Sequence, residues 1–534
     1  MKTRFIIALA LAVCCSTSYA TPVKKKVSAR KTKVTTVNKD SLEHVALVNL
    51  AKKGDADAQN SLGVKYYTGK YVKKDYSTAI HWWATAAKQK HVKAIANMAL
   101  CYQYGRGIQQ DSVMATNLYK SSVKMGNKEL LKEREDLVDR KFNMFDSNLL
   151  ADIYSQGIGV EKDKKKALKY YVLSAKNGNT DASLAAAKIY EQEQSYPEAL
   201  NLYKSIASKN SFASYKMGEY LVKGLGTRVD KSKAAGYLSQ AAKSNVPNAM
   251  ILLGDLYYQG EGVEKDMSKA VELYKSASLT GASVTYWNIG IIYAKGGNGI
   301  DKDFYAAANW LALASKLGFK KLFQEKLLAQ PETEKDGWAG TDFATFIEGL
   351  SHVYGNDKDI NAAYKLFQQL EKKKVAVATT LIATLCYADN DWKKADEKKV
   401  VKYLEKAVEM KDALACYELG LRYKEGKGVA ANKAKAIELL EKGANLGNAK
   451  AMAELGDLFY NGKLVSKDVT QAIQYYMKAY RNGYLSARGA EILSESYEKG
   501  IGGLPKDQDK AKYILTKVTP NDALSNLLKG ILCK

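Results

Sequence analysis

The stretch LGDLYYQGEGVEKDMSKA, residues 253–270, decides the fold of this 534-residue chain because the chain repeats it. The copies align on the small residue that stands at Gly254, and six of the eleven intervals between successive copies are 36 residues. A period of this length is typical of stacked helical units. The aligned small residues are Gly63, Ala99, Ala151, Ala187, Gly218, Gly254, Gly290, Ser351, Thr384, Gly420, Gly456 and Ser494.

Each copy predicts two antiparallel helices. Leu253 and Tyr257 form one stripe of a first helix, and the small residue between them lets a neighbouring helix approach closely. Gly260 and Gly262 end that helix, because glycine adopts turn conformations that other residues reach only at a cost. An aspartate then follows where it can cap a second helix, in the series Asp75, Asp111, Asp163, Asp230, Asp266, Asp303, Asp468 and Asp507. The second helix presents an alanine at its packing face, in the series Ala79, Ala115, Ala167, Ala234, Ala270, Ala307, Ala436, Ala472 and Ala511.

These hairpins predict an all-α fold. One hairpin cannot bury its apolar face alone, so the copies must stack. We therefore expect a right-handed α-solenoid (superhelix) of about twelve antiparallel helix-hairpin repeats.

The first twenty residues predict a cleaved signal peptide. Lys2 and Arg4 are followed by an apolar run over 5–13 that is too short to span a bilayer, and Ala20 ends a small-x-small cleavage pattern. The mature protein is then periplasmic or secreted. Residues 21–42 follow as a basic arm with few large apolar groups, which predicts disorder.

Two insertions interrupt the period. A charged run predicts a helical insertion near 127–142, inside an N-terminal solenoid over 43–318 that holds repeats 1–7. Residues 319–345 form the second insertion, which contains Pro331 and which we interpret as a hinge. A C-terminal solenoid over 346–534 then holds repeats 8–12 and a capping helix.

The pattern Leu-Gly-x-x-Tyr-x-x-Gly-x-Gly-Val-x-x-Asp-x-x-Lys-Ala resembles the Sel-1-like repeat, a relative of the tetratricopeptide repeat. Residues 253–270 match it almost throughout, and the resemblance covers about 43–518. The shortened fourth and eighth copies look more like plain tetratricopeptide repeats, and Val400 makes the ninth copy the weakest. The resemblance implies a scaffold or adaptor that mediates protein–protein interaction and leaves the partner open.

Catalytic, cofactor and metal motifs are not found. The four histidines, His44, His81, His91 and His352, have no metal-ligand spacing. A β-lactamase-like Ser-x-x-Lys occurs at Ser121–Lys124 and Ser28–Lys31, but no companion motif accompanies it. A penicillin-processing enzyme is therefore the weakest alternative, and we expect no enzyme. The scattered cysteines predict no disulfide framework, and Cys386 and Cys416 are the one pair worth testing.

Partner binding is predicted on the concave face of the array, which the first helix of each repeat lines. The positions concerned lie three residues before, one residue after and four residues after the aligned small residue. Tetratricopeptide arrays suggest these positions by analogy, and their spacing places them on one helical face. The candidates are Asn60, Tyr67, Tyr215, Glu219, Asp255, Tyr258, Trp287, Tyr417, Asp457 and Tyr460. The alternative interpretation is that several of them simply pack against the next hairpin.

The charge balance supplies a second hypothesis. The formal net charge is +25, and residues 21–41 carry seven basic residues against one acid. Such an arm could attract an anionic envelope surface, as in a cell-wall, glycan- or lipid-binding module, or it could be a solubilising linker. Nucleic acid is not an expected partner of an exported protein.

Overall fold

The structure, a computed structural model, describes residues 31–329, 337–338, 340–355, 358–386 and 396–519. Across these residues the regular elements are helices, and the extended pairing is a single bridge between Gly297 and Ile300. The predicted signal peptide lies outside the described residues. The chain divides into two compact units, 1–213 and 214–534, and the boundary falls in the first turn of α11.

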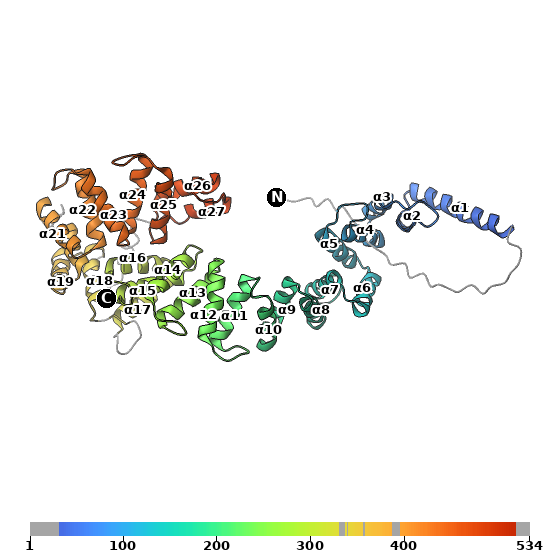
Figure 1. Ribbon diagram of the computed structural model, residues 1–534, viewed down its shortest axis with the longest axis horizontal. Helices are drawn as coiled ribbons and strands as arrows, with labels where there is room; N and C mark the ends of the chain where they lie inside the picture. The colour runs from blue at the N-terminus through green and yellow to red at the C-terminus, as the bar shows by residue number, and fades with distance from the viewer. Residues whose placement is uncertain (1–30, 330–336, 339, 356–357, 387–395, 520–534) are drawn as a thin grey trace. The chain divides into compact units, whose positions relative to one another are not determined.

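The first unit is a row of short helices (Figure 1). Its hairpins pair α2 with α3, α4 with α5, α7 with α8, and α9 with α10. The helices are α1 (Lys31–Lys52), α2 (Ala56–Thr68), α3 (Tyr76–Lys88), α4 (Val92–Tyr104), α5 (Ser112–Lys124), α6 (Lys128–Arg140), α7 (Met144–Gln156), α8 (Lys164–Lys176), α9 (Thr180–Gln192), α10 (Tyr196–Ile206) and the start of α11 (Ser211–Lys223).

The second unit continues with the same hairpins. They pair α11 with α12, α13 with α14, α15 with α16, α18 with α19, α20 and η2 with α21, α22 with α23, α24 with α25, and α26 with α27. The remaining helices are α12 (Lys231–Lys243), α13 (Pro247–Gln259), α14 (Met267–Ser278), α15 (Val284–Lys295), α16 (Phe304–Ala314), η1 (Ser315–Phe319), α17 (Lys320–Leu328), α18 (Asp342–Tyr354), α19 (Ile360–Lys372), α20 (Ala376–Leu381), η2 (Ile382–Cys386), α21 (Glu397–Glu409), α22 (Ala413–Glu425), α23 (Lys433–Asn445), α24 (Ala449–Asn461), α25 (Val469–Arg481), α26 (Ala487–Lys499) and α27 (Gln508–Leu515).

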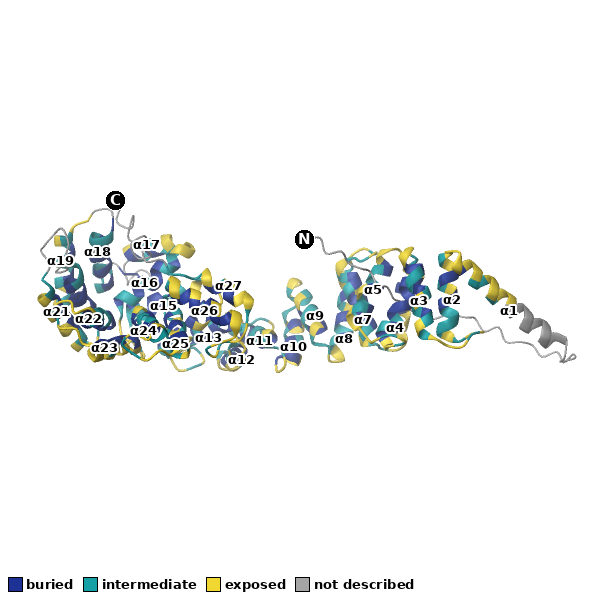
Figure 2. Ribbon diagram, turned by 90° about the horizontal axis from the view of Figure 1, so that it is seen from above, coloured by how far each residue is buried: buried dark blue, intermediate teal, exposed yellow. Residues whose placement is uncertain are grey.

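The hairpin prediction is confirmed in detail. The described residues contain twelve hairpins, so the α-solenoid has the expected number of repeats. All nine packing-face alanines are fully buried. Figure 2 shows buried and exposed residues alternating along the helices of both units. All eight aspartates of the predicted series cap the second helix of their repeat by accepting a backbone N–H. The right-handed sense of the superhelix stays a prediction.

The small residue of each repeat makes room for a large side chain on the second helix. A Cβ atom built at Gly254 would lie 2.7 Å from Cε1 of Tyr274, and one at Gly456 would lie 2.8 Å from Cε1 of Tyr476. In both repeats the ring stands 20 residues after the glycine and is fully buried. The glycine thus fixes how closely the two helices of a hairpin pack.

We expect Gly254→Ala to destabilise the second unit by about 1–3 kcal/mol, because the added methyl group overpacks the Tyr274 contact. Gly236→Ala is the matched control, since Gly236 is an exposed position of α12 where a Cβ meets nothing within 4 Å. There alanine should stabilise the helix by about 0.5–1 kcal/mol. Urea unfolding of both variants measures the difference, and shifts of the same sign would contradict this packing role.

The basic arm differs from its prediction. Residues 31–42 form the first part of α1, which runs unbroken to Lys52, whereas disorder was expected; residues 21–30 lie outside the description. The C-terminal half of α1 packs Leu47, Val48 and Ala51 against α2. A helix that is already nucleated extends at low cost, and residues 31–52 contain no proline or glycine. Packing at one end therefore favours helix along the whole segment.

The predicted hinge also differs. The two units divide after Ala213, and residues 319–345 lie wholly within the second unit. Phe323 and Leu327 of α17, together with Trp338, are buried in a core cluster that also includes residues of α16 and α18. Aromatic side chains thus anchor this insertion. Periodicity could not assign them to a helical stripe.

Other sequence expectations have simpler outcomes. Cys101 and Cys416 are buried free thiols, and the side chain of Cys386 lies outside the described residues. Within the described ranges, no helix has both the length and the apolar character needed to cross a membrane.

Candidate functional site

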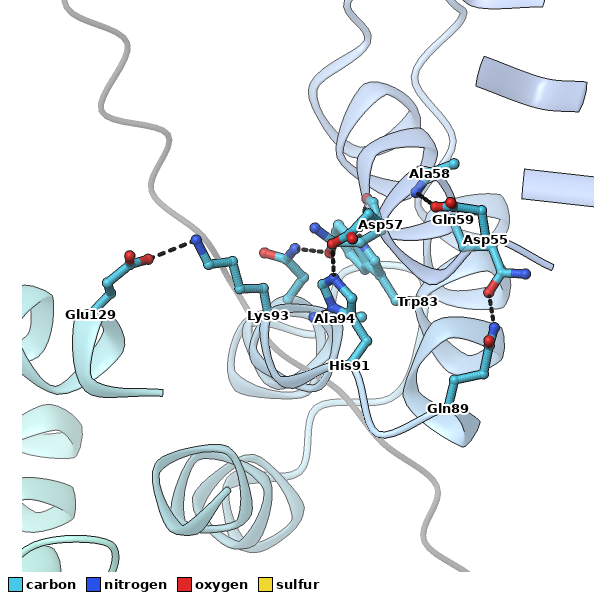
Figure 3. Close-up of polar contacts among 12 residues, drawn as sticks. Asp55, Asp57, Ala58, Gln59, Trp83, Gln89, His91, Lys93, Ala94 and Glu129 are labelled. Carbon is cyan, nitrogen blue, oxygen red and sulfur yellow. Dashed lines mark hydrogen bonds and ion pairs between the residues drawn. The ribbon is translucent and has the colours of Figure 1, made fainter. Parts of the chain in front are cut away.

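The ten predicted partner-binding residues separate into three groups. The first group is held by polar contacts that link helices of the same or the next repeat. In the first unit Asn97 donates its side-chain amide to Oδ1 of Asn60 at 2.8 Å, and Trp83 donates its indole N–H to the Asn60 carbonyl at 3.1 Å. Figure 3 shows this region, where His91 and Asp57 also meet at 2.9 Å. Asn60 therefore joins two repeats.

The predicted acids have a similar structural role. Tyr274 donates its hydroxyl to Asp255 at 2.5 Å, and Tyr476 donates its hydroxyl to Asp457 at 2.8 Å. The same pair recurs in the first unit, where Tyr171 donates to Asp152 at 2.7 Å. In all three repeats the tyrosine follows the aspartate by 19 residues, a signal that the sequence contained. These acids stabilise their own hairpin.

Glu219 is also engaged within its own helix. Lys216 and Lys223 contact its two carboxylate oxygens at 2.6 and 2.7 Å. Burial acts to raise the pKa of Glu219, but the two lysines outweigh it and hold the pKa below its ordinary value. An acid already neutralised on both sides is a weak anchor for a partner.

Trp287 belongs to the core. Only 6% of it is exposed, and its ring stacks on Phe319 at 6.0 Å and contacts Trp338 at 6.0 Å. The structure therefore does not support Trp287 as a partner-binding residue. Phe319 and Trp338, which cover Trp287, belong to the insertion and not to the regular repeat. The repeat position of Trp287 alone therefore suggested that it is exposed.

The remaining predicted residues are half-buried tyrosines. Tyr67, Tyr258 and Tyr460 occupy the same repeat position, four residues after the small residue, and each has a basic group over its ring. Arg106 lies 5.5 Å from the ring centroid of Tyr67, Lys265 lies 6.0 Å from that of Tyr258, and Lys467 lies 5.6 Å from that of Tyr460. Tyr215 and Tyr417 are half-buried as well. We call Tyr258 and Tyr460, both in the second unit, the tyrosine row.

The second unit contains a cavity that the sequence did not reveal. Near it α14 packs against α25, although the two helices are about 200 residues apart in sequence (Figure 1). Lys275 donates to the side-chain oxygen of Asn482 at 2.9 Å, and Gly483 lies against the ring of Trp310. A Cβ at Gly483 would approach that ring to 3.0 Å, so glycine permits this contact.

We call this space of about 200 Å³ the inner cavity. Its walls come from one face of α16, the ends of α15 and α18, the ends of helices in the α22–α25 hairpins, and Thr519. The lining groups that matter for chemistry are Asp303, Tyr305, Trp310, Tyr354, Lys450 and Tyr484. Sequence analysis identified Asp303 only as a helix cap.

Burial perturbs the acids and phenols of the inner cavity. It raises the pKa of Asp303, and it raises the pKa values of Tyr305 and Tyr354 to about 12. Asp412, which caps α22 beside the lining residue Ala413, has its pKa raised to about 7, first by burial and further by the charge of Asp303. The surroundings therefore disfavour additional negative charge.

Metal binding has no support in the described part of the chain, where no group of three or more His, Cys, Asp or Glu side chains is placed to hold an ion. Ser121 of the Ser-x-x-Lys motif lies in the last turn of α5, with its hydroxyl 4.0 Å from the Met125 sulfur.

Comparison with known proteins gives a consistent family match. A family model described as Sel1 repeat matches ten segments, together more than half of the chain: 56–91, 92–127, 148–179, 211–246, 247–279, 283–319, 349–372, 413–448, 449–484 and 488–517. The two hairpins that it leaves out are α9–α10, which is the shortened fourth copy, and the ninth copy, which ends with α21.

Individual relatives are more distant. Chitin synthase regulatory factor 3 of Schizosaccharomyces pombe is 26% identical over 278 residues, which cover 49% of this chain and 28% of that protein. Protein sel-1 homolog 2 of Homo sapiens is 24% identical over 304 residues, covering 55% and 38%. The matched region is thus less than two fifths of either relative. Among solved structures, c5321, a protective antigen of uropathogenic Escherichia coli strains that displays an SLR fold, aligns with a TM-score of 0.34 and 22% identity over 91% of this chain and 96% of that one.

Proposed function

This chain belongs to the Sel1 repeat family, and we propose that it is an exported scaffold that binds a partner protein through the tyrosine row. Sel1 repeats generally mediate protein interactions, and the regulatory role in the name of the Schizosaccharomyces pombe relative is consistent with a scaffold. A repeat array suits this role because each hairpin contacts only its neighbours and leaves an extended surface.

The observation that carries this proposal is the recurrence of a half-buried tyrosine beneath a basic side chain at one repeat position. Tyr460 has a second cation, the Arg488 guanidinium, 5.5 Å from its ring centroid. Tyrosine provides a large contact area at low entropic cost and is enriched at interface hot spots. Lysine and arginine beside it favour an acidic partner segment, in keeping with the net charge of +25.

Tyr258→Ala combined with Tyr460→Ala should weaken partner binding roughly tenfold or more, since truncating a hot-spot side chain costs at least about 1–2 kcal/mol. The measurement is quantitative capture of proteins from an envelope extract by immobilised wild type and variant. Tyr104→Ala is the control, because Tyr104 is exposed and has Arg106 over its ring at 5.2 Å but lies outside this repeat position. Equal capture by all three proteins would overturn the proposal.

Export is the second part of the proposal and rests on residues 1–20 alone. Lys2, Arg4 and the apolar run before Ala20 have the composition of a secretory signal. Mass spectrometry of the protein recovered outside the cytoplasm should find an N-terminus at Thr21. An intact N-terminus and recovery only from the cytoplasm would contradict it.

A further inference from the structure

Five of the nineteen residues that line the inner cavity are aromatic, and the fifth of them, beside the four named next, is Tyr293 of α15. Tyr305 and Trp310 come from α16, Tyr354 from the end of α18, and Tyr484 from the segment after α25. The cavity volume of about 200 Å³ is many times what a single water needs. Aromatic rings around a small space are the arrangement that proteins use to hold organic ammonium groups, because the ring faces carry partial negative charge.

The amide groups of the inner cavity are already engaged. Asn309 donates to the carbonyl of Tyr305 at 2.9 Å, and Asn448 accepts the backbone N–H of Ala451 at 2.8 Å. Asn482 accepts from Lys275 at 2.9 Å and donates to the carbonyl of Lys478 at 2.8 Å. A neutral polyol would have to compete with these bonds. Asp303 also has a bond, because its Oδ1 accepts the backbone N–H of Ala306 at 2.8 Å, but a carboxylate can accept several donors. Recognition therefore falls mainly to the rings and to the carboxylate of Asp303.

Three carboxyl groups lie at or near the inner cavity, against two basic groups. These are Lys450 of the lining and the buried Lys275, whose ammonium is bonded to the lining residue Asn482 and lies 5.6 Å from the ring centroid of Tyr293. The excess of acids favours a cation.

Asp303 lines the cavity, and Asp412 and Glu418 of the α22 hairpin act electrostatically on the lining phenol of Tyr305. Burial raises the pKa of all three carboxyl groups, because desolvation disfavours their charged form. The basic residue of the lining, Lys450, is exposed and therefore lies on the solvent side, where its charge acts on Glu418.

We propose that the inner cavity binds an alkylammonium group, with the ammonium beside Asp303 and the alkyl chain against Tyr305, Tyr354 and Trp310. The group could come from a free amine or from a lysine side chain of another protein. This binding site is separate from the tyrosine row, so either proposal can fail without the other.

The direct test is calorimetric titration of the full chain with butylammonium chloride at low salt and pH 8. We expect a Kd on the order of 1 mM, as is reasonable for a ligand of five heavy atoms. Butanol and sodium butyrate have the same chain length without the positive charge and should bind at least tenfold more weakly. Equal binding of butanol or butyrate would overturn the proposal, as would no heat of binding for butylammonium up to 50 mM, taken as roughly 50 times the expected Kd.

Asp303→Asn is the informative variant, because asparagine still caps a helix and the fold is retained. It should weaken butylammonium binding about tenfold. Asp266→Asn is the matched control: Asp266 caps α14 in the same way one repeat earlier and does not line the cavity. It should leave the affinity unchanged. Equal effects of the two substitutions, or no effect of Asp303→Asn, would contradict a role for the Asp303 charge.

The pH dependence gives an independent readout. Asp412 has a pKa of about 7 and therefore gains a proton as the pH falls from 8 to 6, which removes negative charge near the cavity. Binding of butylammonium should weaken over this range, and Asp412→Asn should flatten the dependence. An unchanged pH profile in Asp412→Asn would argue against ammonium binding near this carboxyl group.

A final experiment distinguishes a free amine from a lysine side chain of another protein as the source of the ammonium group. The peptide acetyl-Gly-Lys-Gly-amide is titrated beside its acetyllysine counterpart. Binding of the lysine peptide and not of the acetylated one assigns the site to a protein side chain. Binding of butylammonium without either peptide assigns it to a free amine. Tighter binding of the acetylated peptide would overturn recognition of the positive charge.

Discussion

Replacing Asp146 with alanine should lower the free energy of unfolding of the first unit by about 3–5 kcal/mol, because it leaves the guanidinium of Arg134 buried without its carboxylate. Arg134 lies on the inserted helix α6 and contacts Oδ1 of Asp146 on α7 at 2.8 Å. The side chains are 9% and 0% exposed. Arg134 also donates to the hydroxyl of Tyr119 on α5 at 2.6 Å, so one side chain joins three helices.

The matched control is Asp139→Ala on the same inserted helix. Asp139 pairs with Lys169 at 2.9 Å, but both side chains are more than half exposed. Water solvates both charges there, so we expect a loss below about 1 kcal/mol. The double variant Arg134→Met/Asp146→Leu removes both buried charges together and should recover most of the stability lost in Asp146→Ala. Urea unfolding followed by circular dichroism compares the three, and equal losses in Asp146→Ala and Asp139→Ala would show that burial is not the cause.

Trp338→Ala should cost the second unit about 3–5 kcal/mol, the range for removing a large aromatic side chain from a core. Its ring lies 5.0 Å from that of Phe343, 5.7 Å from that of Phe323 and 6.0 Å from that of Trp287. Its backbone N–H donates to the carbonyl of Lys326 at 2.9 Å, which ties it to α17. The side chain thus fastens the insertion 319–345 to the hairpins before and after it.

This experiment also distinguishes an integrated insertion from a hinge. A flexible hinge would tolerate Trp338→Ala with a loss within about 0.5 kcal/mol. Leu328→Ala is the control in the same insertion, since Leu328 is 77% exposed and should change stability little. Trp338→Phe should retain most of the stability, because the indole N–H has no hydrogen-bond partner among the residues that the structure describes. A thermal or urea unfolding series on these variants gives the result.

The residues that act within one hairpin could be predicted from the sequence. Gly254 and Tyr274, or Asp266 and the start of α14, are at most about 20 residues apart, and their relation repeats with the period. Because the chain contains many copies of the repeat, the copies can be compared with one another, as related sequences would be. The same reasoning predicted a partner-binding stripe on the first helices, but it could not separate Tyr258, which stays half-exposed, from Asp255, which bonds to Tyr274.

Sequence by itself therefore determined the hairpin, its caps, its close packing and the number of copies, because these depend on contacts between neighbours in the chain. Tertiary structure decided the burial of Trp287 under Trp338, the pairing of Arg134 with Asp146, and the inner cavity. The cavity brings together residues as far apart in sequence as Tyr293 and Thr519, and their approach depends on small rotations accumulated over several repeats. No local sequence pattern encodes the accumulated rotation of several repeats. The charge of Asp303 could therefore be recognised as a possible binding determinant only from the stacked repeats.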